Sequence, residues 1–214
     1  QRERLVEQAL ATAGGGIDVL VHNAGVEHIG AFETRDGAAL ADTLAINLLA
    51  PLDLVRRLLP DMLARGRGHI VMVASLAGAG GPAYAADYAA TKAGQIAFTR
   101  SLRSEYRARG VSASVVLPGY VSDAGMFARR RQAGAVDAPR VLGTVRRADV
   151  AAAVVRAIAE DRREVYVARR GTRLAVAIGE LVPTLGDRMS RWSGADEVMR
   201  DWGGRPGPGS ESGP

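Results

Sequence analysis

The run HIVMVA at residues 69–74 is the clearest strand candidate, because five of its six residues are apolar and none is charged. Short apolar runs rich in β-branched residues are typical of parallel strands that helices cover on both faces. Similar runs occupy residues 17–22, 111–117 and 164–168, the last of them short and expected at a sheet edge. Strands that alternate with amphipathic stretches predict βαβ units, right-handed crossovers and one parallel sheet between helix layers.

The segments between these strands carry apolar residues at helical spacing. The expected helices are an opening one that ends at the glycines 14–16, and then residues 38–64, 85–107, 148–160 and 172–192. Pro51 and Pro60 should bend or divide the long second helix. Gly179 and Pro183 should weaken the last stretch as one straight helix. Some twenty residues after the third strand are expected to form a loop.

A chain of 214 residues and 22.4 kDa is long enough for one sizeable domain and too short for two large ones. We therefore expect residues 1–202, including the helical stretch 172–192, to form a single domain. Residues 203–214 are rich in Gly, Pro and Ser and should form a disordered tail. The lack of cysteine excludes disulfides, iron–sulfur clusters and thiol chemistry.

Basic residues outnumber acidic ones by 28 to 23, which gives a net charge of +5 and a pI near 10.2. Lys92 is the only lysine, and the arginines are scattered, so we expect no nucleic-acid partner. The three histidines show no metal-ligand spacing, so no metal site is expected. No apolar run of about 18 residues and no charged-then-apolar leader is present, which favours a cytoplasmic protein without a transmembrane span.

The motif YAATK at residues 88–92 places a phenol and an ammonium on one face of a predicted helix. A cation within roughly 4–6 Å favours the phenolate, and it can bring the tyrosine pKa from about 10 toward the range of acid–base catalysis. An ordinary surface pair is the alternative. Because arginine occupies every other basic position, the single lysine indicates a demand for a compact amine.

Two further polar residues are candidates for the same site. Ser75 directly follows the strand at 69–74, at the carboxyl end where open α/β sheets bind ligands. Its hydroxyl could donate a hydrogen bond to a substrate oxygen, although a serine alone is more often a turn residue. Asn47 lies inside a predicted helix, where an amide is mildly unfavourable, and a satisfied buried amide is the alternative there.

In order and spacing these residues resemble the short-chain dehydrogenase/reductase family, from about residue 5 to about residue 168. The matching features are Asn23-Ala24-Gly25 after the first strand, Asn47, Ser75, the Tyr88/Lys92 pair and Pro118-Gly119-Tyr120-Val121-Ser122 after the third strand. The resemblance implies a Rossmann-type doubly wound parallel sheet in three α/β/α layers. It also implies an oxidoreductase that transfers hydride between NAD or NADP and a carbonyl or secondary alcohol.

The resemblance also implies roles for the candidate catalytic residues. Tyr88 would exchange a proton with the substrate oxygen, and Lys92 would lower the Tyr88 pKa and hold the nicotinamide ribose. Ser75 would steady the carbonyl, and Asn47 would seat a water that links Lys92 to solvent as a proton relay. The implied cofactor-binding residues, besides Tyr88 and Lys92, are Asn23, Ala24 and Gly25 on the adenosine side, and Pro118, Gly119, Val121 and Ser122 beside the nicotinamide.

The family's glycine-rich phosphate loop is the main departure, because the 214 residues contain no TGxxxGxG. The glycines at 14–16 end a helix and lead into a strand, whereas a phosphate loop follows a strand and opens a helix. We therefore expect a chain truncated by roughly seventy residues, without its first βαβαβ portion and inactive by itself. The strand at 17–22 would be an uncovered apolar edge, so this chain alone should be unstable or aggregate.

Two other functions stay open at this point. One is a catalytically inactive relative that serves binding or assembly, and the other is a nucleotide-sugar epimerase or dehydratase. Met126 and Phe127 favour an apolar substrate pocket. The arginines at 129–131 are typical of a solvated basic turn, with contact to an acidic carrier as the alternative.

Two parts of the chain suggest contact with further copies of the chain or with a membrane. By resemblance, the helices at 38–64 and 85–107 would form the interface of a homodimer or homotetramer. The stretch 172–192 should pack against its own domain or a second copy. Peripheral membrane contact through Trp192 and the flanking arginines is the alternative.

Overall fold

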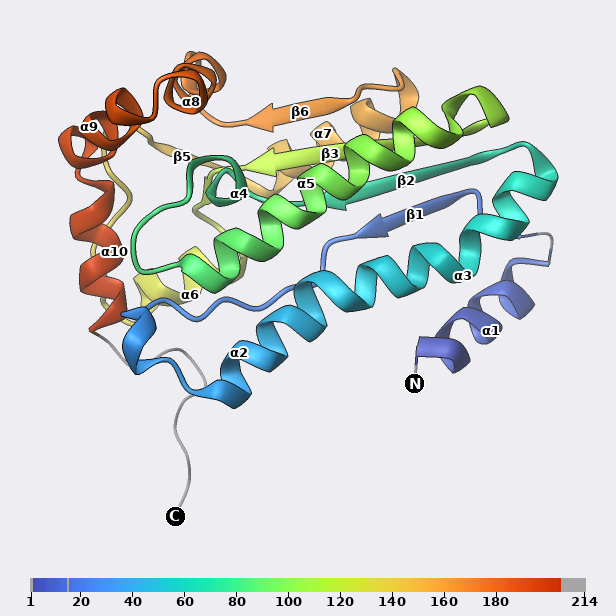
Figure 1. Ribbon diagram of the computed structural model, residues 1–214, viewed down its shortest axis with the longest axis horizontal. Coiled ribbons are helices and arrows are strands. Elements are labelled where there is room, and N and C mark those ends of the chain that lie inside the picture. The colour runs from blue at the N-terminus through green and yellow to red at the C-terminus, as the bar shows by residue number, and fades with distance from the viewer. Residues whose placement is uncertain (1, 15, 205–214) are drawn as a thin grey trace.

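The computed structural model describes residues 2–14 and 16–204, and its main sheet is a four-stranded parallel sheet with helices on both faces (Figure 1). The strands lie in the order β1-β2-β3-β6 and are all parallel. They are β1 (Val19–His22), β2 (Gly68–Val73), β3 (Val111–Pro118) and β6 (Glu164–Val167). This arrangement confirms the α/β class predicted from the sequence, with β6 at a sheet edge.

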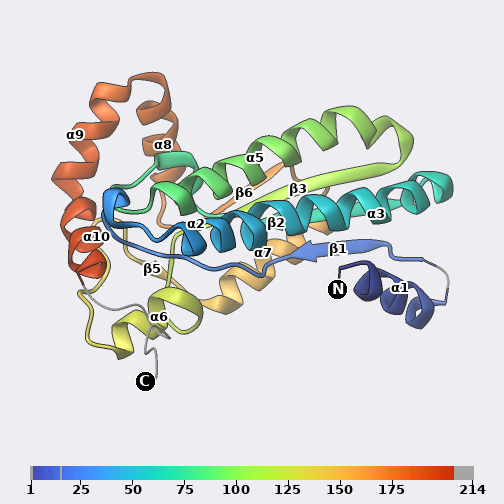
Figure 2. The same cartoon turned by 60° about the horizontal axis from the view of Figure 1, so that its bottom comes forward.

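The sheet is the middle layer of three. Helices α3 (Ala50–Arg65) and α5 (Ala86–Tyr106) cover one face, and α7 (Arg147–Ala159) covers the other (Figure 2). The remaining helices are α1 (Arg2–Ala13), α2 (Gly37–Leu44), α4 (Ala77–Gly80), α6 (Gly125–Gln132), α8 (Thr172–Leu181), α9 (Pro183–Ser193) and α10 (Ala195–Gly203). Of these, α1 packs on α3 and α4 packs on α5.

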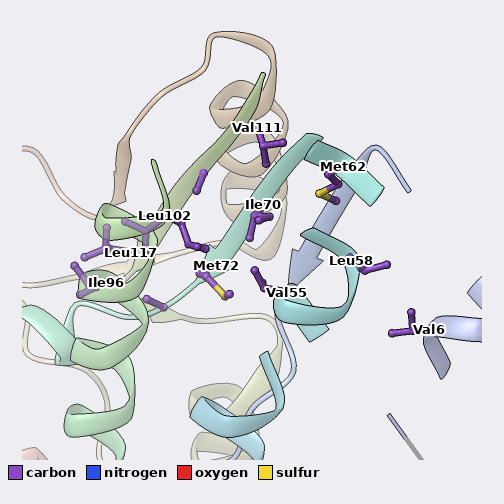
Figure 3. Packing of buried hydrophobic residues seen from close by; sticks show 13 residues of the cluster. Val6, Val55, Leu58, Met62, Ile70, Met72, Ile96, Leu102, Val111 and Leu117 are labelled. Atoms are coloured by element: carbon purple, nitrogen blue, oxygen red, sulfur yellow. The ribbon is translucent and has the colours of Figure 1, made fainter. Parts of the chain in front are cut away.

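Side chains of β2 alternate between the two helix layers, as the period of two in a strand requires. Ile70 and Met72 point toward α3 and α5, in the buried cluster drawn in Figure 3. Val71, between them, packs against Ala153 and Ala157 of α7, which are both fully buried. Burial on both faces explains why the strand is an almost unbroken apolar run.

The long helix predicted at 38–64 is divided near Pro51. A π-helical turn (Ala45–Leu49) joins α2 to α3, and Pro51 lies in the first turn of α3. Proline has no N–H for the carbonyl four residues earlier, so a regular hydrogen-bond ladder cannot pass through this point. Pro60 lies inside α3, which continues through it without a break.

The combined segment Gly37–Arg65 is long and apolar enough to cross a membrane by length and composition alone. Its inner side, however, carries Val55, Leu58 and Met62 into the core beneath the sheet. Asn47, a polar residue, is fully buried on the same segment. This packing is that of a helix layer on a sheet, as the sequence pattern predicted.

The C-terminal stretch 172–192 forms two helices rather than one, and the break between α8 and α9 falls just before Pro183. The sequence did not predict α10, which extends to Gly203, so helix includes the first residue of the expected tail. Gly204 follows in a turn, and residues 205–214 of that tail lie outside the described residues.

The segment after β3 is also more ordered than the loop expected there. It contains α6 and two short parallel strands, β4 (Tyr120–Val121) and β5 (Thr144–Val145). At the other side of the sheet, Val19 and Val21 of β1 are 39% and 42% exposed. In the described chain β1 is therefore an edge strand with an apolar surface, as its place in the sheet order requires.

Gly78 determines how closely α4 approaches α5. A Cβ at this position would lie 2.5 Å from the Lys92 backbone carbon and 2.7 Å from the Ala93 nitrogen. We predict that Gly78→Ala lowers the free energy of unfolding by about 1–3 kcal/mol, because backbone atoms cannot move aside as a flexible side chain does. Chemical denaturation measures this loss. Gly80→Ala is the matched control, since nothing lies within 4 Å of a Cβ there, and equal losses in both variants would contradict the prediction.

Candidate active site

A cleft of about 1480 Å³ opens at the carboxyl ends of β1, β2 and β3. This is the edge at which open α/β sheets bind ligands. Nine of the eleven residues predicted from the sequence line the cleft: Asn23, Ala24, Gly25, Ser75, Tyr88, Lys92, Pro118, Gly119 and Val121. Asn47 and Ser122 do not line it. The structure thus brings most of the predicted residues together around one cavity.

Tyr88 and Lys92 lie in the first half of α5, and their side chains are buried together. They are 9% and 3% exposed, and the Lys92 Nζ lies 5.7 Å from the centre of the Tyr88 ring. Burial raises the pKa of Tyr88 well above its usual range, Glu27 raises it further, and a hydrogen bond with Ser75 acts in the opposite direction. Tyr88 is therefore a protonated phenol at neutral pH in the described chain.

The Lys92 ammonium donates hydrogen bonds to the Val73 carbonyl oxygen at 3.1 Å and to Gln95 Oε1 at 3.3 Å. Burial lowers the Lys92 pKa to about 8, and the charge of Glu27 acts in the opposite direction. The described residues provide two acceptors for the three ammonium N–H groups, so one N–H group can donate to a ligand in the cleft. A partly titrating cation beside a phenol can change the acidity of that phenol.

Asn47 holds the loop that follows β1. Its Oδ1 accepts from the Val26 N–H and its Nδ2 donates to the Val26 carbonyl, both at 2.8 Å. Nδ2 also lies 3.3 Å from Thr91 Oγ1 on α5. A Cβ on Gly25 would lie 3.1 Å from Asn47 Oδ1 and 3.6 Å from the Lys92 Nζ. The amide therefore joins the β1 loop to α5, and Gly25 leaves open the space beside the ammonium.

Ser75 and Ser122 are held in different ways. The Ser75 Oγ accepts from the Ala77 N–H at 3.1 Å, which fixes the hydroxyl at the start of α4 near Tyr88. The Ser122 Oγ instead donates to the Val145 carbonyl at 3.2 Å, and the Ser122 N–H donates to the same oxygen. Ser122 thus supports the pairing of β4 with β5 and does not line the cleft.

The sequence did not reveal a buried ion pair next to the cleft, in which Glu27 lines the cleft and Arg130 lies behind it. Arg130 Nε of α6 lies 3.0 Å from Glu27 Oε1, and the two side chains are 6% and 12% exposed. Burial raises the Glu27 pKa, and Arg130 opposes that shift. The solvated basic turn expected at residues 129–131 is therefore wrong for Arg130, while Arg129 lines the cleft.

Three aromatic rings form an apolar wall beside this ion pair. Tyr120, Phe127 and Trp202 have ring centres 5.2–5.8 Å apart, and all three line the cleft. Phe127 was predicted from the sequence as part of an apolar pocket. Trp202 was not, because it lies on α10 within a stretch expected to end the domain. This side of the cleft therefore combines aromatic surface with an adjacent buried charge pair.

His22 ends β1 and is 7% exposed, and its Nδ1 has no hydrogen-bond partner among the described residues. Burial lowers the His22 pKa to about 4, and Lys92 contributes to the shift. His22 is therefore neutral at physiological pH. Within residues 2–14 and 16–204 no cluster of three metal-ligating side chains is present.

An open parallel sheet with a Tyr–Lys pair and a serine at its carboxyl edge defines a Rossmann-type oxidoreductase domain. The family model described as short chain dehydrogenase matches residues 1–134. Ketoacyl reductase HetN of Nostoc sp. strain PCC 7120 is 43% identical over 199 residues, which are 91% of this chain and 68% of HetN. The chain therefore belongs to the short-chain dehydrogenase family of oxidoreductases.

Two further matches agree with this assignment. The 3-oxoacyl-[acyl-carrier-protein] reductase FabG of Vibrio cholerae is 35% identical over 116 residues, 54% of this chain and 48% of FabG. A metagenomic short-chain oxidoreductase solved in complex with NADP is 34% identical with a TM-score of 0.61, over 78% of this chain and 68% of that one. The chain spans about two thirds of HetN and about half of FabG.

We predict that Arg130→Met lowers the free energy of unfolding by about 3 kcal/mol at neutral pH, because it leaves the Glu27 carboxylate buried without its partner. The folded-state pKa of Glu27 is raised, so folded protein holds this proton more tightly, and stability falls as pH rises through that pKa. The loss should therefore be larger at about pH 8 than at about pH 5 in urea denaturation.

Arg131→Met is the matched control on the same helix. Arg131 forms an exposed pair with Asp137 at 3.5 Å, and exposed pairs contribute about 0–1 kcal/mol. A loss in Arg130→Met that is no larger than in the control, or that does not depend on pH, would show that the buried pair is unimportant.

Proposed function

We propose that the chain is the catalytic part of a reductase that uses NAD or NADP to interconvert a carbonyl compound and its secondary alcohol. The observation that carries this proposal is the buried Tyr88–Lys92 pair beside Ser75 at the floor of the cleft. Ser75, Tyr88 and Lys92 are the proposed catalytic residues, and Asn47 is a positioning residue that holds the loop next to them.

The residues present fit the nicotinamide half of such a cofactor. Gly25 keeps open a space beside the Lys92 ammonium that a side chain would fill, and an ammonium N–H there suits ribose hydroxyls. The residues proposed to line the cofactor are Asn23, Ala24 and Gly25 on one side, and Pro118, Gly119 and Val121 on the other. When bound, NAD(P) supplies or accepts the hydride. The 214 residues contain no TGxxxGxG motif, so the proposal concerns this half of the site.

The electrostatics favour Tyr88 as a proton donor. Its pKa is raised, so the hydroxyl is protonated at neutral pH and can give its proton to a carbonyl oxygen that gains charge during reduction. Ser75 can donate a second hydrogen bond to the same oxygen. The Lys92 ammonium then stabilises the phenolate that remains. These three groups together describe acid catalysis of carbonyl reduction.

The proposed substrate is an apolar 3-oxoacyl compound. HetN is named a ketoacyl reductase, and FabG acts on 3-oxoacyl groups carried by acyl carrier protein. The wall of Tyr120, Phe127 and Trp202 offers apolar surface for an acyl chain. Arg129, which lines the cleft, could contact an acidic group on a carrier.

We also propose a homodimer or homotetramer that associates through the α2–α3 and α5 region. Leu44, Ile46 and Leu49 are 36%, 38% and 57% exposed on that surface. Apolar side chains gathered on one exposed region are typical of subunit interfaces. A cytoplasmic location agrees with such an enzyme.

Tyr88→Phe tests the function. It removes the hydroxyl proton and keeps the ring, so we expect kcat for reduction of a 3-oxoacyl substrate in the full-length protein to fall by at least about 100-fold. Steady-state oxidation of NADPH and NADH, followed by absorbance, measures the change. Tyr106→Phe, at the far end of α5, is the matched control and should keep wild-type turnover. Wild-type turnover by Tyr88→Phe would refute the assignment.

A further inference from the structure

Gln95 lies nearly one turn after Lys92 on α5 and is fully buried. Its Oε1 accepts from the Lys92 ammonium at 3.3 Å, and its Nε2 donates to the backbone carbonyl of Asn47 at 2.5 Å. One carboxamide therefore connects the two residues that the family resemblance linked through a water. Neither the Tyr–Lys motif nor the helical pattern drew attention to this residue.

The orientation of this carboxamide is fixed by its two neighbours. An ammonium can only donate hydrogen bonds, so the amide oxygen must face Lys92. A backbone carbonyl can only accept, so the amide nitrogen must face Asn47. Turning the amide over would break both bonds and leave buried polar groups without partners, which is costly. The bridge that the Gln95 carboxamide forms between the Lys92 ammonium and the Asn47 carbonyl therefore has only one arrangement.

The Asn47 carbonyl is available because of Pro51. In a regular helix the N–H of residue 51 would bond to this carbonyl, but proline has no N–H. The π-helical turn (Ala45–Leu49) carries the backbone past this point. A buried carbonyl requires a donor, and the Gln95 amide donates to this one in place of residue 51. Pro51 and Gln95 therefore act together on the Asn47 carbonyl, although 44 positions separate them in the sequence.

We propose that Gln95 is a positioning residue that keeps the Lys92 ammonium charged and aimed at Tyr88, and that it occupies the link between Lys92 and Asn47. The inference rests on the proposed function of the Tyr88–Lys92 pair. The Gln95 oxygen and the Val73 carbonyl stabilise the ammonium without neutralising it, because both are dipoles. A carboxylate in that place would cancel much of the field at Tyr88.

Other ionisable groups also act on Lys92. Glu27, in the loop after β1, favours the charged ammonium, and His22, at the end of β1, is close enough for a charge interaction with it. Tyr88 lies on the same helix. Glu27 is itself paired with Arg130. Among the described residues, the Gln95 carboxamide forms hydrogen bonds with Lys92 and the Asn47 carbonyl and with none of these groups, so a change at Gln95 leaves their own pairings intact.

The test is the protonation of Lys92 in the full-length protein, observed by ¹⁵N NMR after labelling lysine at Nζ. Lys92 is the one lysine in these 214 residues, and Lys92→Arg identifies its resonance. Gln95→Leu removes an acceptor from the charged form, so we expect the Lys92 pKa to fall by about one unit. An unchanged pKa in Gln95→Leu would overturn the inference.

Thr99→Val is the matched control. Thr99 is 1% exposed, lies one turn further along α5, and donates to the Gln95 backbone carbonyl at 2.7 Å. It touches neither Lys92 nor Asn47 through a side-chain hydrogen bond in the described structure. The variant therefore loses a buried hydrogen bond, as Gln95→Leu does, but should keep the wild-type Lys92 pKa. An equal shift in both variants would show a general loss of packing and would count against the bridge.

Gln95→Glu keeps the test decisive if Gln95→Leu fails to fold. It places a carboxylate beside the ammonium, so we expect the Lys92 pKa to rise above the wild-type value. A direct contact between residue 95 and Lys92 predicts that Gln95→Leu and Gln95→Glu shift the Lys92 pKa in opposite directions. A merely structural role of Gln95 does not predict this. A wild-type Lys92 pKa in Gln95→Glu would overturn the proposal.

Turnover provides the second readout. Gln95→Leu should lower kcat with little change in KM, and the loss should grow toward about tenfold above about pH 8, where the variant has lost the Lys92 charge. If Gln95→Leu shifts the Lys92 pKa but the wild-type protein reduces no 3-oxoacyl substrate, the proposed function is refuted and the role of Gln95 as a bridge is supported. Normal turnover with an unshifted pKa in Gln95→Leu would refute the bridge and leave the function standing.

Discussion

A buried ammonium is the constraint on which the arrangement of the cleft depends. Lys92 is 3% exposed, and a charge so far from water is stable only where polar groups replace its hydration. Those groups come from separate elements: the Val73 carbonyl ends β2, and the Gln95 carboxamide belongs to α5. The Glu27 charge acts from the loop after β1. The positions of β2, α5 and this loop are therefore mutually dependent, and Tyr88 is placed by the same helix that places the ammonium.

Irregular backbone and residues without side chains fix the rest of the geometry around the cleft. Pro51 interrupts the helix ladder and frees the Asn47 carbonyl, while the Asn47 side chain binds both backbone polar groups of Val26. Gly25 and Gly78 act by having no side chain: the first leaves space beside the ammonium, and the second lets α4 touch the α5 backbone at Lys92. A regular helix and ordinary side chains at these positions would close the cleft or separate its walls.

Local properties explain what could be predicted from the sequence. The strand at 69–74 is recognisable because burial on two faces removes polar residues from it, and the Tyr88/Lys92 spacing fixes a shared helix face. The Glu27–Arg130 pair joins residues 103 positions apart, and no period or spacing relates them. Gln95 was missed for the same reason, since its partner Asn47 lies 48 positions away. Such contacts depend on how the elements pack, which single-residue patterns do not encode.

Lys92, which lines the cleft, and Arg130, which binds Glu27 of the cleft lining, have different electrostatic roles. Arginine stays protonated in proteins, so Arg130 provides a permanent partner for the buried Glu27 carboxylate. Lys92 has a pKa of about 8, so its charge responds to small changes around it within the working range of an enzyme. A guanidinium at position 92 would present a planar fork to Val73 and Gln95, which offer two separate single acceptors that suit an ammonium. A chain that otherwise uses arginine throughout therefore has its one lysine where the charge must be both compact and adjustable.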